Sequence, residues 1–332
     1  MAPSETAAPP TPSALPRWNA LAWLAVLTLL AFTATRAAFG DERWLLLVWG
    51  AYTPFVLLPA YATLAYGLAR AQRALTLLSL GLVALHLVRV VPQIALRAPS
   101  DARPRSALRV ATVNGNGWNE RPELTLLPLE RQAPDLVCLQ ELSPAWADGL
   151  RDEGFLDEYP HQHLVVREGV WGMGLLSRYP LHDVRAHDLN EAPAIEAGLT
   201  HEGRTLRVLC VHPAPPAGDL LPSHLDALRQ ILAWTEAHRE VSAVVLGDLN
   251  STPYSRFSDA MRAYVSDAWE LAGARGFGHT WPNNGMLYPP ARLDHIYVTP
   301  SLGVAHAELG LPGLSDHAPL VADIVLRDAH QP

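Results

Sequence analysis

The chain has 332 residues with a formal net charge of −8, and 49% of its residues are hydrophobic. This length suggests about two domains with ample apolar material for a core. The first 97 residues contain seven arginines and three acidic residues, which leaves 18 arginines and 30 acidic residues, a net charge of −12, for the rest. Such an acidic domain argues against a tight, nonspecific grip on a nucleic-acid backbone, although bound divalent cations would cancel several carboxylates locally.

The N-terminal part of the chain is strongly apolar. Residues 1–16 contain five prolines and small residues, and we expect them to be disordered. Three apolar segments follow, and we expect transmembrane helices at 18–38, 44–69 and 74–96. The second segment has 26 residues without a charge, enough for a helix of roughly 39 Å. The sequence therefore predicts a multi-pass membrane region across 17–97.

Alternatives exist for these segments. The first could be a cleaved signal peptide, but its length and the lack of a clear small-residue cleavage site favour a span. The second would be unusually long and unbroken for a soluble core helix. His86 and Arg89 interrupt the third, and Arg89 lies near enough to one end to reach the membrane surface. The arginine distribution mildly disfavours export of the C-terminal part under the positive-inside rule.

Residues 98–106 form a polar, proline-containing linker, and we place a second domain at 107–328. Apolar runs that suit strands lie at 107–114, 135–140, 163–166, 170–177, 181–189, 205–212, 241–246, 292–299 and 318–326. Patterns that suit helices lie at 123–132, 142–150, 219–238 and 255–264. Many short strands with few intervening helices favour a layered α/β domain over a regular βαβ repeat.

The chain contains two cysteines, Cys138 and Cys210, each inside an apolar strand-like run. We expect both to be small buried core residues, because a disulfide would require their strands to be neighbours. Their spacing fits neither a zinc site nor a disulfide framework.

Polar residues recur where the predicted strands end. The clusters contain Asn114, Glu141, His212, Asp248 with Asn250, Asp294, and Asp316 with His317. If they converge, four carboxylates share one cleft, which is unfavourable unless a cation lies among them. Oxygen and amide ligands without thiolates suit a hard ion, so we expect Mg²⁺ or Mn²⁺.

Seven motifs occur in an order that resembles the endonuclease/exonuclease/phosphatase superfamily: ATVNGNG, PDLVCLQE, GMGLLSRYPL, VHPAPP, VVLGDLNSTP, RLDHIYV and LSDHAPLV. The resemblance covers about Leu108 to Leu326. It implies a four-layered α/β sandwich, in which two packed β-sheets are flanked by helices, with a metal-dependent phosphoester hydrolase site at one edge. For the metal, it implies that Glu141 is the principal ligand and that Asn114 and Asp316 occupy supporting positions.

The same resemblance implies the catalytic roles. Asp248 and Asn250 match the pair that orients or deprotonates the attacking water and holds a phosphate oxygen. His317 matches a histidine that contacts the scissile phosphate and is paired with an aspartate, here Asp294. His212 matches a second histidine, placed to protonate the leaving oxygen. The resemblance leaves open which group is the general base.

Several of these residues have simpler interpretations. Asn114 could merely end a strand before a glycine turn, Asp294 could be a surface acid, and His212 could be an ordinary histidine with no acidic partner that the sequence identifies. His161, His163 and His201 lack a motif and are expected at the surface. The segment 279–284 resembles a family loop near the substrate, although its Trp281 could equally be a packing residue.

Together these patterns predict a membrane-anchored, metal-dependent enzyme that hydrolyses a phosphodiester, either a nucleic acid or a phospholipid. The alternatives are a phosphomonoesterase and a catalytically silent binding module of the same fold. The resemblance favours an extracytoplasmic domain, against the arginine count. We expect a lipid bilayer and a phosphoester substrate as binding partners, and we predict no protein partner.

Overall fold

The computed structural model describes residues 17–94, 104, 106–119, 121–274, 276–310 and 313–327. They fall into two compact units, one of residues up to Ala38 with Pro54–Val88 and one of Phe39–Thr53 with the residues from Arg89 onward. The disorder predicted for 1–16 and most of the predicted linker, 98–106, lie outside the described residues.

The N-terminal helices are α1 (Arg17–Phe39), α2 (Trp44–Ala51), α3 (Thr53–Val56), α4 (Pro59–Ala69), α5 (Arg73–Val90) and η1 (Val91–Gln93). In the first unit, Val26, Ala60 and Leu75 belong to one buried apolar cluster. Among the described residues, α1 and the segment Arg73–Gln93 are long and apolar enough to cross a membrane, and a third span results if α2 and the segment Thr53–Ala69 are counted as one bent span. Two to three spans are therefore available by length and composition.

The continuous helix expected over 44–69 is broken, which differs from the prediction. Proline lacks a backbone N–H, so Pro54 cannot donate to the carbonyl of Gly50, its partner in an unbroken helix. The hydroxyl of Thr53 donates to that carbonyl instead, at 2.6 Å. The chain therefore leaves the α2 axis at Tyr52, and α2 becomes a separate short helix.

The second unit contains two mixed sheets of six strands among its described residues, with the orders β11-β12-β1-β2-β4-β3 and β5-β6-β7-β8-β10-β9. The first is built from β1 (Leu108–Asn114), β2 (Leu136–Gln140), β3 (His161–Val165), β4 (Met173–Ser177), β11 (Leu302–Leu309) and β12 (Leu320–Leu326). The second is built from β5 (Leu181–Asp188), β6 (Pro193–His201), β7 (Arg204–Val211), β8 (Ala243–Asp248), β9 (Ser266–Asp267) and β10 (Asp294–Val298).

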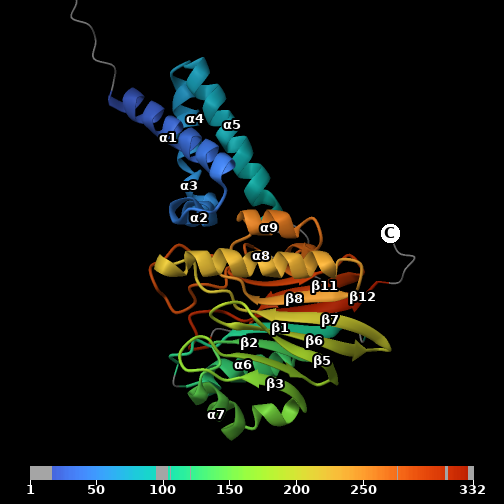
Figure 1. The fold of residues 1–332 in the computed structure, drawn as a ribbon. Helices are drawn as coiled ribbons and strands as arrows, with labels where there is room; N and C mark the ends of the chain where they lie inside the picture. Colours follow the sequence, from blue (N-terminus) through green and yellow to red (C-terminus); the bar gives the residue numbers. More distant parts are fainter. Residues whose placement is uncertain are drawn as a thin grey trace, which may run out of the picture. The chain divides into compact units, whose positions relative to one another are not determined.

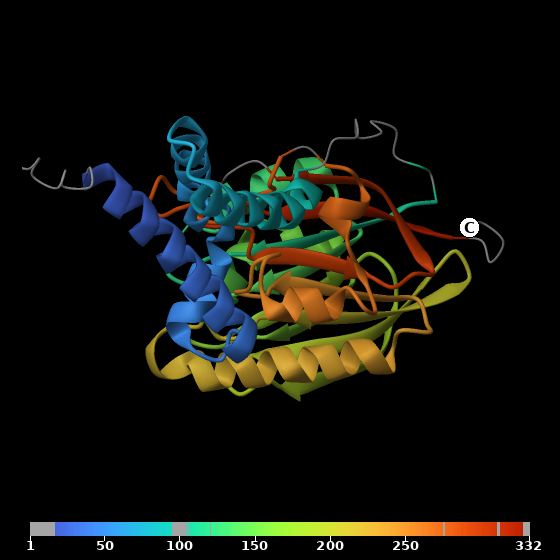
Figure 2. The ribbon, with the colours of Figure 1, turned by 90° about the horizontal axis from the view of Figure 1, so that it is seen from above.

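Helices cover the outer faces of both sheets (Figure 1). They include α6 (Glu123–Gln132), α7 (Pro144–Asp152), α8 (Leu221–Ala237) and α9 (Arg256–Met261), with the short helices η2 (Phe155–Glu158) after α7 and η3 (Gly218–Leu220) before α8. The helix α10 (Ala268–Leu271) packs instead into the core between the sheets, through Ala268 and Trp269. Apolar side chains of both sheets fill the core between them, including Val110 and Val208. Trp146 of α7 packs on the outside of the first sheet, and Ile231 of α8 packs on the outside of the second. Figure 2 shows α8 and α9 side by side over that sheet. The predicted four-layered sandwich is confirmed.

The two cysteines form a disulfide, so the prediction of two unpaired core residues was wrong. Cys138 lies on β2 in one sheet and Cys210 lies on β7 in the other. The two strands are not hydrogen-bonded neighbours but face each other across the core, which brings the two sulfur atoms together. The disulfide therefore joins the two sheets.

One other expectation also differs from the structure. His201, expected at the surface, is buried, because its ring packs edge-on against Tyr179 with the centroids 4.9 Å apart. Arg89 donates to both carboxylate oxygens of Asp259 at 2.8 and 2.9 Å, and its position at the membrane surface stays a prediction.

Candidate active site

The ends of several strands meet at one edge of the sandwich. β1 and β2 run parallel, so Asn114 and the residue after β2, Glu141, emerge together. β7 and β8 are also parallel, so His212 follows β7 beside the end of β8 at Asp248. β10 is antiparallel to β8 and begins at Asp294, directly opposite Asp248. The polar residues that end these strands therefore come from both sheets.

A glycine permits the close approach of β7 and β8 at this edge. A Cβ atom on Gly247 would lie 1.9 Å from the carbonyl oxygen of Val211, so no larger residue fits without moving the backbone. The approach places Oδ2 of Asp248 at 3.7 Å from Nε2 of His212. The same nitrogen lies 4.0 Å from Oε1 of Glu141. His212 thus has the acidic neighbours that the sequence did not identify.

Asn114 joins the two principal carboxylates. Its buried Nδ2 donates to Oε1 of Glu141 and to Oδ2 of Asp248, both at 3.0 Å. The other oxygen of Glu141 accepts from the backbone N–H of Gly117 at 2.7 Å. Glu141 has φ 60, a left-handed conformation that costs a side chain with a Cβ on the order of 1–3 kcal/mol. The two hydrogen bonds to its carboxylate help to offset that cost, so Asn114 does more than end a strand.

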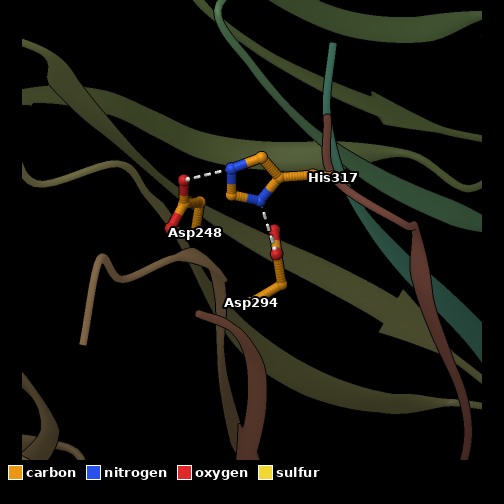
Figure 3. Close-up of side chains that lie close together, drawn as sticks. All are labelled: Asp248, Asp294 and His317. Carbon is orange, nitrogen blue, oxygen red and sulfur yellow. Dashed lines mark hydrogen bonds and ion pairs between the residues drawn. The ribbon is translucent and has the colours of Figure 1, made fainter. Parts of the chain in front are cut away.

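His317 lies between two aspartates (Figure 3). Its Nδ1 is 2.8 Å from Oδ2 of Asp294, and its Nε2 is 3.7 Å from Oδ2 of Asp248. Ser315 fixes the loop that carries it, since its hydroxyl donates to the carbonyl of Asn114 at 2.7 Å and accepts from the His317 N–H at 3.0 Å. Asp294 is fully buried, which excludes the surface interpretation of this residue.

The charges within this cluster stabilise one another. Burial alone would lower the pKa of His317, but the charges of Asp294 and Asp248 outweigh it and raise the pKa to about 10. Burial would raise the pKa of Asp248, but His317 and His212 hold it below its usual range. The pKa of Asp294 is raised, because burial and the charge of Asp248 together outweigh the attraction of His317. His317 is therefore an imidazolium at neutral pH, beside an ionised Asp248.

Asn250 and Asp316 complete the predicted set. The N–H of Asn250 donates to Oδ1 of Asp248 at 2.8 Å, and its side-chain amide donates to the carbonyl of Pro213 at 3.1 Å. Oδ2 of Asp316 accepts from the indole of Trp281 at 3.2 Å. Trp281 thus contacts a site residue, in agreement with the loop resemblance.

Two supporting residues were missed from the sequence. Thr280 is buried, and its hydroxyl accepts from the backbone N–H of Asp294 at 3.2 Å. Ser315 holds the His317 loop against β1 through the contacts given above. Thr280 precedes Trp281 and Ser315 precedes Asp316, and both of these neighbours were named from the sequence as candidate site residues. Their position next to candidate residues was the sequence feature that could have identified them.

Two sets of residues offer ligands for a metal. Among the described residues, Asp248, Asp294 and His317 present ligand atoms within 4.8 Å of one another. Within this set, Nδ1 of His317 already contacts Oδ2 of Asp294 at 2.8 Å. The oxygens of Glu141, Asn114 and Asp316 are hard donors, and the Glu141 side chain is 16% exposed. Oxygen donors of this kind suit a hard divalent ion. The amide oxygen of Asn114 accepts from the backbone N–H of Asn116 at 3.0 Å, and the metal role of these three residues stays a prediction.

Residues 97–317 match the model of the endonuclease/exonuclease/phosphatase family. The chain is a member of this family. Its members are metal-dependent phosphoester hydrolases, and the observed sandwich and the buried Asp/Asp/His group are consistent with that chemistry.

Solved structures show the same fold as this family member. The endonuclease/exonuclease/phosphatase from Bacteroides vulgatus is 22% identical, with a TM-score of 0.57 over 67% of this chain and 100% of that chain. TDP2 of D. rerio complexed with single strand DNA product is 21% identical, with a TM-score of 0.57 over 66% of this chain and 99% of that chain. Identities this low establish the shared fold alone. No curated protein sequence matches this chain.

Proposed function

We propose that this family member is a membrane-anchored phosphodiesterase that uses a divalent metal ion and water to cleave a phosphodiester. One observation carries the proposal: Asn114 joins Glu141 to Asp248, and Oδ2 of Asp248 lies 3.7 Å from a nitrogen of both His212 and His317. With a phosphoryl group bound here, the two histidines would serve as proton or hydrogen-bond donors and the carboxylate of Asp248 as a proton acceptor.

Glu141, Asn114 and Asp316 would hold the metal ion, for which Mg²⁺ or Mn²⁺ suits these oxygen donors. When bound, the ion would polarise a phosphoryl oxygen and stabilise the charge that develops there. Asn114 keeps Glu141 in position through the 3.0 Å hydrogen bond between Nδ2 and Oε1.

The protein side chains move the protons. Asp248 is ionised and has two amide hydrogen bonds that orient it, so it accepts a proton from the attacking water. His317 already holds its proton, so it donates a hydrogen bond to a phosphate oxygen rather than acting as the base. His212 donates a proton to the leaving oxygen. A P–O bond to the water oxygen forms, the P–O bond to the leaving group breaks, and the products are a phosphomonoester and an alcohol.

We place the catalytic domain on the extracytoplasmic side. The Cys138–Cys210 disulfide supports this side, because disulfides persist in oxidising compartments and are rare in the cytosol. The two to three candidate spans support a membrane anchor. The bilayer and a phosphoester substrate are the partners that this arrangement requires.

A substrate panel tests the proposal. Full-length protein in detergent is assayed on phosphodiesters and phosphomonoesters with Mg²⁺ and with a chelator, and wild type is compared with Glu141→Ala and His317→Ala. We expect diester hydrolysis by wild type with metal and a large loss in both variants. Equal turnover by all three proteins would exclude this site, and a wild type that is inactive on every substrate would favour the silent binding module.

A further inference from the structure

A cavity of about 660 Å³ adjoins the candidate active site. Glu141, His212, Asp248 and His317 line one part of it. Its other walls are formed mainly by aliphatic and aromatic side chains of α2, α8 and α9. Its volume lies within the range of small-molecule pockets, about 300–1,000 Å³. The cavity therefore extends from the polar site into an apolar space.

One apolar wall belongs to α8. Leu225, Leu228 and Leu232 line the cavity at positions i, i+3 and i+7, which share one face of a helix. A rise of about 1.5 Å per residue makes this stripe roughly 10 Å long. These three side chains are uncharged, which suits contact with a hydrocarbon chain, while His224 and Arg229 of the same helix also line the cavity.

A second apolar wall belongs to α2. Leu47, Val48 and Ala51 line the cavity from this helix. The segment is tied to α9, because the buried carboxylate of Asp41 accepts from the backbone N–H of Arg256 at 2.6 Å. An acidic side chain is stabilised at the first turn of a helix. The cavity is thus lined in part by a segment from the N-terminal part of the chain.

The chemistry of these walls favours a lipid over a nucleic acid. Proteins that bind single strands combine basic grooves with aromatic stacking surfaces. The lining residues named from α2 and α8 are aliphatic, and the whole lining holds two arginines, Arg229 and Arg256, against five acidic residues. The chain beyond residue 97 likewise has a net charge of −12. Only four residues separate α2 from α1, which is a candidate membrane span. Two tryptophans of α2, Trp44 and Trp49, are 48% and 44% exposed. Tryptophan is enriched where membranes meet water.

We propose that this cavity binds the hydrocarbon chain of an amphiphilic phosphodiester, with the chain between α2 and α8 and the phosphate at His212, Asp248 and His317. The inference rests on the proposed phosphodiesterase function and specifies its substrate class as a lipid phosphodiester. α2 is then a specificity-determining wall of the active site.

The test uses p-nitrophenyl alkyl phosphates with methyl, butyl and octyl chains and full-length protein in lipid nanodiscs. Each buried methylene is expected to raise kcat/KM by about fourfold until the cavity is filled. A Val48→Trp variant fills the cavity from α2, and Leu45→Trp introduces the same side chain at a position of α2 that is 61% exposed. We expect Val48→Trp to lower kcat/KM for the octyl ester at least tenfold and to leave the methyl ester within twofold. Leu45→Trp is expected to change neither.

Three outcomes would overturn the inference: no chain-length dependence in wild type, an equal loss on both esters in Val48→Trp, or cleavage of a single-stranded oligonucleotide in preference to the octyl ester. Failure of the proposed function is distinguishable, since then no ester of any length would turn over. In that case, octyl phosphonate binding is measured in the same nanodiscs. Binding that is tighter than that of methyl phosphonate and is lost in Val48→Trp supports the chain site, and equal binding of the two phosphonates contradicts it.

Discussion

Nδ1 of His317 lies 2.8 Å from Oδ2 of Asp294, and both side chains are buried. This contact fixes the ring so that Nε2 faces Asp248. It also helps to keep the imidazole protonated despite its burial. The orientation and the charge of His317 therefore both depend on Asp294.

Replacing Asp294 with asparagine removes its charge but keeps a side chain of the same size with an oxygen that can accept a hydrogen bond. We expect this change to impair catalysis. We expect Asp294→Asn to lower kcat by about 100-fold to 10,000-fold, the range for a positioned proton donor or acceptor. The double variant with His317→Ala should lose little more than the worse single variant, because the two residues act as a unit. Asp148→Asn, at a side chain that is 72% exposed, is the control for charge loss alone. Steady-state kinetics on a diester substrate measures these losses. A kcat of Asp294→Asn within threefold of wild type would contradict the dependence of His317 on Asp294.

The raised pKa of His317 predicts how stability depends on pH. A group whose pKa rises on folding contributes fully below its ordinary value of 6.5, and that contribution is lost as the pH rises through about 10. The stability advantage of wild type over His317→Gln should therefore shrink on the alkaline side. Thermal unfolding in a chelator, followed across this pH range for both proteins, measures the difference. An advantage that stayed constant or grew with pH would refute the assignment of a protonated His317.

Metal binding should be visible as stabilisation. A ligand that binds only the folded state raises the unfolding free energy by about 2.7 kcal/mol at 100 times its Kd. We expect Mg²⁺ or Mn²⁺ to raise the Tm of wild type and to have little effect on Glu141→Gln. Glu240→Gln, at a side chain that is 84% exposed, should respond like wild type. The same metal response in Glu141→Gln and wild type would place the ion elsewhere.

Loss of the disulfide should affect stability more than catalysis. Cys138 and Cys210 are 72 residues apart and lie in the core between the sheets. Replacing both with alanine is expected to cost about 2–4 kcal/mol of unfolding free energy and to leave KM unchanged. Chemical denaturation of the two proteins measures the cost. In cells, thiol blocking before lysis should find no free thiol, and two free thiols would argue for a cytoplasmic domain.

The polar ends of the strands could be predicted from the sequence because each one ends a strong apolar run. Asn114, Glu141 and Asp248 lie at or directly after β1, β2 and β8, and parallel pairing brings such ends together. The strand β11 was missed, because a register shift between Val304 and His306 breaks its alternation. β6 was also missed, since small residues and a glycine interrupt its apolar run.

Other features depend on contacts between distant segments, which no local pattern encodes. The disulfide depends on which strands of the two sheets face each other. The cavity wall depends on the contact of Asp41 with Arg256, residues 215 positions apart. The break after α2 was encoded locally by Pro54, but the length of the uncharged run favoured one continuous helix.

The most direct measurement follows the oxygen of the attacking water. A phosphodiester is hydrolysed in ¹⁸O-labelled water by wild type and by His317→Ala, with Mg²⁺ and with a chelator, and the products are analysed by mass spectrometry. Attack at phosphorus predicts one labelled oxygen in the phosphomonoester, none in the alcohol, and a large loss of product in the variant and in the chelator. Label in the alcohol, or equal product from His317→Ala, would contradict water attack at phosphorus in this site.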